Sequence, residues 1–212
     1  MPKNIYEKRT FNISELRTIT NDKGLKTITG YAAVFNSLSE DLGGFREKID
    51  REAFAKTIQN ADVRALFNHD KNYVLGRTKS GTLKLSSDEH GLKIENIPPD
   101  TQWARDLLVS IDRGDVNQMS FGFRTISDKW EKRDKEDIRT LLEVELFDIS
   151  PVTFPAYPDT EVGLRSLENF KKTIDPLIDS QKNQSNPLIR TGLIAQEDEI
   201  FKKLKRIGGK NE

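Results

Sequence analysis

Residues 100–124, DTQWARDLLVSIDRGDVNQMSFGFR, join the two kinds of local structure that the fold must contain. The first part predicts a helix that begins at an Asp/Thr cap and carries Trp103, Leu107 and Ile111 at helical spacing before Gly114. The second part predicts a strand that follows at once, because its apolar residues alternate. A helix joined directly to a strand indicates a mixed α and β domain.

The predicted strand has one apolar face and one small or polar face. Met119, Phe121 and Phe123 share the first face, and Ser120 and Gly122 lie on the second. Ser120 therefore has two interpretations. It is an ordinary serine on a solvated face, or it is a nucleophile displayed beside a small residue that keeps the approach to it clear.

The sequence on the N-terminal side of this stretch continues the mixed pattern. Strands are expected over residues 9–36 and 62–70, and a meander of short strands over residues 73–99. Residues 50–61 predict a short helix with Asp50 as its N-cap.

The C-terminal side contains a strong strand and then loses its core character. TLLEVELFDISPVTF, residues 140–154, predicts the strand, and the charged residues 128–139 before it predict a hairpin tip or loop outside the core. Beyond residue 167 the chain is polar and rich in Gln, Asn and Ser. We therefore expect an α+β domain with a mainly antiparallel sheet and two helices over residues 1–166, and a partly helical or disordered tail over residues 167–212.

Composition excludes several classes of function. The 34 Lys and Arg residues balance the 34 Asp and Glu residues, so the chain lacks the basic footprint of a nucleic-acid binder. It has no cysteine, which excludes a disulfide scaffold and a thiol nucleophile. No window approaches the roughly 18 apolar residues of a membrane span. We expect no nucleic-acid partner and no membrane partner.

The chain has two histidines, so a histidine-dependent mechanism must use one of them. His90 lies in an acidic turn sequence, SSDEHGLK, where solvation explains it. His69 follows an apolar strand face, and it is either a hydrogen-bonded strand-end residue or a general base. Two histidines without cysteine make a poor metal site, and the phosphate-binding glycine motifs are missing from the sequence. We expect no metal and no cofactor.

A serine nucleophile needs a base, and the base needs a group that holds it. Residues 140–154 offer a candidate, because an apolar stripe from Leu142 to Leu146 places Asp148 next on its face. A carboxylate on an apolar face is costly unless it finds a donor, and His69 could be that donor. The alternative for Asp148 is a strand-end carboxylate that caps a turn. Glu145 lies on the opposite face, where exposure explains it more easily.

Four stretches in order, with their spacing, resemble a known family. They are GYAAVFN with REAFAKTI, VRALFNHDKNYVLGRT, VNQMSFGFR and LFDISPVTFPAYPDT, and they span roughly residues 9–165. In this order they are similar to the phage prohead proteases, a family of capsid-maturation serine proteases related in fold to the herpesvirus assemblins. The resemblance implies a mainly antiparallel β-barrel core with flanking helices, and the activity of a serine endopeptidase.

The resemblance also implies roles for the residues singled out above. Ser120 in QMSFGF matches the nucleophile, and His69 in FNHD matches the general base. Asp148 is the best-placed match for the third member of the triad, and Glu145 is the alternative.

Substrates and location follow from the same resemblance. The substrates would be the scaffolding domain and the major capsid protein precursor, and also the protease itself, cut inside the prohead in the host cytoplasm. The polar tail would then be an autoprocessing site or a tether to the capsid interior. The sequence leaves a homo-oligomer open. The alternative function is a non-catalytic capsid-assembly module on the same β-barrel.

Overall fold

A computed structural model describes residues 6–11, 15–133, 136–154 and 167–173. The chain divides into two compact units, Met1–Leu167 and Glu168–Glu212. The described part of the second unit, residues 168–173, is helical. The expected tail beyond residue 173 lies outside the described residues, and so does the PAYPDT end of the fourth resembling stretch. The first unit contains the candidate site.

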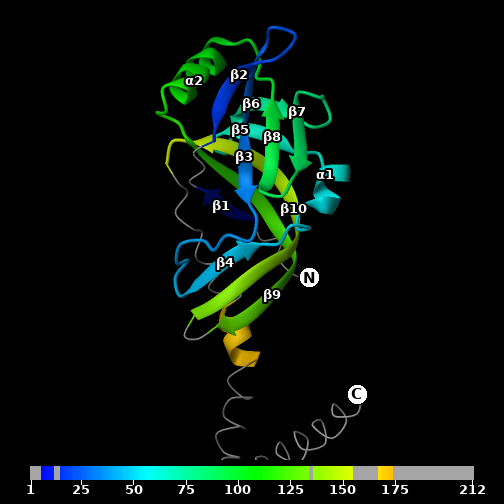
Figure 1. The fold of residues 1–212 in the computed structure, drawn as a ribbon, viewed down its shortest axis with the longest axis vertical. Helices are drawn as coiled ribbons and strands as arrows, with labels where there is room; N and C mark the ends of the chain where they lie inside the picture. Colours follow the sequence, from blue (N-terminus) through cyan, green and yellow to red (C-terminus); the bar gives the residue numbers. More distant parts are fainter. Residues whose placement is uncertain (1–5, 12–14, 134–135, 155–166, 174–212) are drawn as a thin grey trace, which may run out of the picture. The chain divides into compact units, whose positions relative to one another are not determined.

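Figure 1 shows a unit built mostly of strands with few helices, which confirms the expected α+β class. In chain order the labelled elements are β1 (Glu7–Phe11), β2 (Arg17–Thr20), β3 (Lys26–Val34), β4 (Phe45–Ile49), α1 (Ala55–Asn60), β5 (Arg64–Phe67), β6 (Asp70–Arg77), β7 (Leu83–Ser87), β8 (Gly91–Asn96), α2 (Gln102–Asp112), β9 (Gln118–Arg133) and β10 (Glu136–Val152).

The strands form two sheets. The larger has the order β1-β9-β10-β5-β6, with β4 also paired to β10, and the smaller has the order β2-β3-β8-β7. Most pairs are antiparallel, as expected, but β10 runs parallel to both β4 and β5. The strand pairs of the described residues do not close into a ring, so the expected β-barrel is not found there.

The long β9–β10 hairpin organises the larger sheet and reaches further than the sequence suggests (Figure 1). Residues 128–139 were expected to be a tip or loop, but β9 continues to Arg133 and β10 begins at Glu136. Within this charged segment Asp137, Ile138 and Arg139 are buried. The expectation was wrong because charged residues were assumed to face water, whereas Arg139 is matched by buried carboxylates.

Side chains from both sheets enter one apolar core. Met119, Phe121 and Phe123 are fully buried and pack with residues of β3, β8 and α2. Helix α2 buries Leu107 and Ile111, as its spacing predicts. This core fixes β9 firmly in the middle of the fold.

Helix α1 is shorter than expected and starts differently. It begins at Ala55 after Phe54, and Asp50 does not cap it. Instead, the Asp50 carboxylate accepts a hydrogen bond from the backbone N–H of Glu52, at 3.0 Å, in a local turn. Among the helices of the described ranges, none has the length and apolarity that a membrane crossing requires.

Candidate active site

Ser120 lies on β9 with its hydroxyl on the face opposite the apolar core. Its neighbours Met119 and Phe121 anchor the strand in that core, so the alternation expected from the sequence holds here. The second face is not solvated, however, because Ser120 has 0% exposure and Gly122 is also buried. Ser120 is therefore not a filler on a wet face. Its hydroxyl must be satisfied by the protein, and the partner is His69.

His69 lies in the two-residue turn of the β5–β6 hairpin and not on a strand. Asn68 and His69 have φ of 54° and 59°, the left-handed pair that a type I′ hairpin turn requires. The left-handed conformation is strained for a residue with a Cβ, and such strain clusters at functional sites. The turn is tied to the end of β10, because the Asn68 N–H donates to the Pro151 carbonyl at 3.0 Å and the Asn68 side-chain oxygen accepts from Thr153 N–H at 2.9 Å.

The turn brings the His69 ring onto Ser120 and Asp148. Nε2 lies 2.7 Å from Ser120 Oγ, and Nδ1 lies 2.5 Å from Asp148 Oδ1. The His69 and Asp148 side chains are 6% and 7% exposed, so both contacts are shielded from bulk water. With the proton on Nδ1, the ring donates to Asp148, and Nε2 is left as an acceptor for the Ser120 hydroxyl.

A β-bulge explains how Asp148 reaches this face. In the β9–β10 register Leu146 pairs with Phe123, which lies on the core face, but Asp148 pairs with Gly122, which lies on the Ser120 face. The expectation that Asp148 shares a face with Leu146 was wrong, because the irregularity at Phe147 adds one residue and reverses the alternation. Without this bulge the carboxylate would point into the apolar core.

A second irregularity shifts the start of the predicted apolar stripe. Leu141 is fully buried and Leu142 is 37% exposed, the reverse of the expected pattern. The register shift between Leu141 and Glu143 causes this change.

Glu145, the alternative third member, lies on the same face of the sheet as Asp148 because of the bulge between them, so the expectation of opposite faces was wrong. It forms an ion pair with Arg124, and its side chain is 41% exposed. Arg124 pairs with Glu145 in the strand register, so the two side chains form a cross-strand pair.

Asp148 has two further partners that were not predicted. The Tyr6 hydroxyl donates to Oδ2 at 2.6 Å, and the Ser150 hydroxyl donates to Oδ1 at 3.0 Å. Burial raises the pKa of Asp148, but the hydrogen bond and charge of His69 and the hydrogen bonds from Tyr6 and Ser150 outweigh it, so the pKa lies below its usual range. Asp148 is thus held as a carboxylate.

Gly122 makes room for these contacts. A Cβ at this position would lie 2.0 Å from the Tyr6 hydroxyl oxygen and 2.4 Å from Asp148 Oδ2. The sequence suggested that Gly122 clears the approach to Ser120, whereas the structure shows that it admits Tyr6 and Asp148. Ser150 could have been found from period-two spacing after Asp148. Tyr6, at a separation of 142 residues, had no signal in the sequence.

A groove of about 700 Å³ adjoins the His69–Asp148 end of the site. Its walls combine apolar side chains with cations, including Leu66, Val74 and Phe147 with Arg64 and Lys71. A groove whose apolar walls carry a few polar groups is a common kind of ligand-binding site.

Serine, imidazole and carboxylate in this arrangement can carry out acyl transfer with the serine as nucleophile. The imidazole can take the hydroxyl proton, and the carboxylate can hold the ring and stabilise its cation. Among the side chains that line the groove, His69 is the imidazole and Asp148 the carboxylate, and Lys8, Arg64 and Lys71 are the basic residues.

A comparison with protein families matches most of the chain. A family model described as Caudovirus prohead serine protease matches residues 13–173. No curated protein matches the sequence. Among solved structures, the capsid assembly protease of bacteriophage T4 is similar with a TM-score of 0.43 and 10% identity, over 70% of this chain and 96% of that one.

Proposed function

The chain belongs to the caudovirus prohead serine protease family, and we propose that it is the endopeptidase that cleaves scaffolding and capsid precursor proteins during prohead maturation. The observation that carries the proposal is the continuous chain of contacts from Ser120 through His69 to Asp148. The family match spans all three residues.

The proposed reaction begins with proton transfer from Ser120 to His69. His69 Nε2 takes the hydroxyl proton while Oγ forms a bond to the scissile carbonyl carbon. The imidazolium then gives this proton to the leaving amine as the peptide C–N bond breaks, which leaves an acyl-enzyme. Water, deprotonated by the same imidazole, attacks the ester and releases the second product and the free serine.

Asp148 is the proposed third member of the triad. Its contact with Nδ1 holds the ring in the tautomer that leaves Nε2 free to accept, and its charge stabilises the imidazolium. Burial and the contact with His69 favour Asp148, because Glu145 is paired with Arg124 and exposed.

The substrate chain would bind in the groove beside His69 and Asp148. Substrates of this kind are the scaffolding part of the immature shell and the major capsid protein precursor, and we place the reaction inside the prohead. The polar tail beyond residue 167 is proposed as an autoprocessing site or a tether, because segments rich in Gln, Asn and Ser resist packing and are easily cut. A relation in fold to the herpesvirus assemblins is part of this proposal.

The test is co-expression of the full chain with its cognate capsid precursor. We expect Ser120→Ala and His69→Ala to abolish cleavage and the accumulation of mature shells. Ser127→Ala is the matched control, because Ser127 is exposed on the same strand. Unchanged cleavage by Ser120→Ala would refute the proposal and favour the non-catalytic assembly module.

A further inference from the structure

Tyr6 completes the hydrogen-bonding shell of the Asp148 carboxylate. Its hydroxyl donates to Oδ2, at 2.6 Å, while His69 and Ser150 contact Oδ1. We propose that Tyr6 is a positioning residue for Asp148, delivered to the site by β1, which a buried ion-pair cluster holds in register. This inference rests on the proposed function and adds a fourth residue to it.

The carboxylate needs a donor on each oxygen if its plane is to be fixed. Contacts to Oδ1 alone leave the group free to rotate about its terminal torsion, which is broad for aspartate. A donor on Oδ2 removes that freedom and satisfies a buried acceptor that is costly to leave unpaired. Tyr6 therefore fixes the direction in which Asp148 presents Oδ1 to the imidazole.

Two features around Tyr6 are built for this contact. Gly122 leaves the space that the hydroxyl occupies, since a Cβ there would overlap it at 2.0 Å. The Tyr6 ring stacks on Phe147, with ring centroids 6.0 Å apart and planes inclined by 27°. Phe147 is the residue of the β-bulge, so the irregularity that re-aims Asp148 also supports Tyr6.

Strand β1 presents Tyr6 from one face and is anchored by the other. Lys8 pairs with Gly122 in the β1–β9 register, and Tyr6 precedes it by two residues on the same face. Glu7 and Arg9 pair with Phe123 and Phe121, so they lie on the opposite face.

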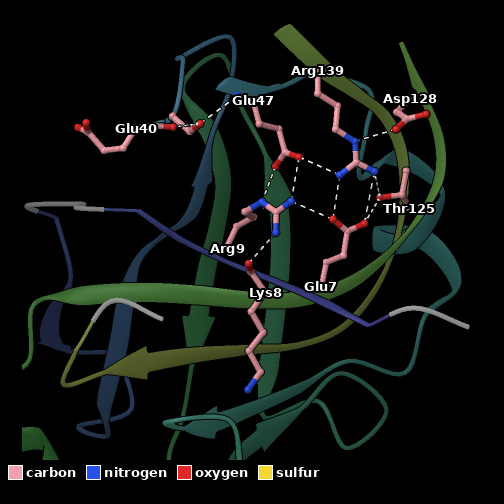
Figure 2. Close-up of polar contacts among 9 residues, drawn as sticks. Glu7, Lys8, Arg9, Glu40, Glu47, Thr125, Asp128 and Arg139 are labelled. Atoms are coloured by element: carbon pink, nitrogen blue, oxygen red, sulfur yellow. Dashed lines mark hydrogen bonds and ion pairs between the residues drawn. The ribbon is translucent and has the colours of Figure 1, made fainter. Parts of the chain in front are cut away.

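The anchoring face carries a buried network of charges (Figure 2). Arg9 contacts Glu47 at 2.7 Å and Glu7 at 2.8 Å, and Arg139 contacts Glu7 at 2.8 Å and Glu47 at 3.1 Å. The four side chains are 2–6% exposed. Strand β1 lies at the edge of the sheet, where its pairing with β9 could shift by one residue. Such a shift would move Glu7 and Arg9 to the other face of the sheet and would take Tyr6 away from Asp148. The matched charges thus specify the register that places Tyr6.

The test compares Tyr6→Phe with Tyr73→Phe in the full chain. Tyr73 is a matched control because it is similarly exposed, at 42% against 39%, and packs its ring on Trp103 outside the site. We expect cleavage of the co-expressed capsid precursor to fall about tenfold in Tyr6→Phe, as for the loss of one hydrogen bond to a charged group. Tyr73→Phe should match wild type.

The pH profile separates positioning from a merely structural role. The charged groups that face His69 and Tyr6 are Asp148 and the groove cations Lys8, Arg64 and Lys71. Loss of the Tyr6 donor leaves more negative charge on the Asp148 carboxylate, which then stabilises the imidazolium more strongly, so the acid limb of the cleavage rate should move to higher pH. A lower rate with an unmoved acid limb would overturn the inference, and so would a rate equal to wild type.

A spectroscopic reading does not depend on turnover. The proton between His69 Nδ1 and Asp148 should give a strongly downfield NMR resonance, and a His90→Gln background leaves His69 as the one histidine. We expect Tyr6→Phe to shift or broaden this resonance and Tyr73→Phe to leave it in place. An unchanged resonance in Tyr6→Phe would contradict the role of Tyr6, whereas an inactive wild type would contradict the proposed function alone.

Discussion

His69 Nε2 lies 2.7 Å from Ser120 Oγ, although 51 residues separate them in the chain. The contact is made by a two-residue hairpin turn with positive φ at Asn68 and His69, which projects the ring over β10 onto β9. The fold therefore holds the ring of the candidate base from a turn, while the nucleophile and the carboxylate lie on strands of the packed sheet. Both strands are rigid supports for reactive groups.

Asp148→Asn should remove most of the activity without removing the fold. An amide can occupy the same space, but it does not stabilise the imidazolium, and it favours the wrong tautomer of His69. We expect the cleavage rate to fall by roughly 10³- to 10⁴-fold. Glu145→Gln is the control, and it should stay within a few-fold of wild type because Glu145 pairs with Arg124. The opposite ranking of the two variants would make Glu145 the third member.

Gly122→Ala should damage the site through sterics alone. Its Cβ would overlap the Tyr6 hydroxyl and the Asp148 carboxylate, so one of them must move. We expect a loss of cleavage together with a lower unfolding midpoint. Gly81→Ala is the control, since Gly81 has a φ of 72° but nothing within 4 Å of its Cβ position. It should cost about 1–2 kcal/mol of stability with full activity. Normal activity in Gly122→Ala would show that the Tyr6–Asp148 contact is dispensable.

Because of Glu7 in the buried network, the free energy of unfolding should decrease at acid pH. Burial raises the pKa of Glu7, but Arg139 and Arg9 lower it by more than burial raises it. The folded-state pKa of Glu7 therefore lies below the usual range. The stabilisation is then complete above the unfolded-state pKa of about 4.3 and is lost as the pH falls through the folded-state value. Urea unfolding between pH 7 and pH 3 should show this decline.

Glu7→Gln tests the assignment of that decline. At pH 7 it should cost about 3–5 kcal/mol, because two buried guanidinium groups lose a charge partner. Its stability should then fall less steeply than that of wild type below pH 5. Equal slopes in the two proteins would assign the acid loss to other carboxylates.

If the network sets the register of β1, Glu47→Gln should displace Tyr6 and so lower the rate of cleavage. Glu47 contacts Arg9 from β4 and has no contact with the triad. In a double-mutant cycle, the effect of Glu47→Gln on the rate should shrink in a Tyr6→Phe background. Additive effects on the rate would separate the network from the site.

The sequence supports the main elements of the fold and the identity of the candidate nucleophile and base. Alternation separated Ser120 and Gly122 from the core-facing aromatics, and two histidines left little choice of base. Asp148 was identified as well, but with a faulty reason, because period-two reasoning does not anticipate the bulge at Phe147.

Other features depend on contacts that no local pattern encodes. Arg139 was predicted to be exposed because charged side chains usually are. The carboxylates that pair with it come from β1 and β4, which are distant in the chain. Tyr6 contacts Asp148 across 142 residues, so it becomes visible only when the sheet order is known.

The most direct measurement is the site of covalent labelling by a fluorophosphonate probe. The probe is added to the full chain co-assembled with its capsid precursor, and the modified peptide is identified by mass spectrometry. One phosphonyl group on Ser120 is expected, present in Ser127→Ala and lost in His69→Ala. A preparation that cleaves the precursor without labelling Ser120, or that is labelled at another serine, would contradict the assignment of Ser120 as the nucleophile.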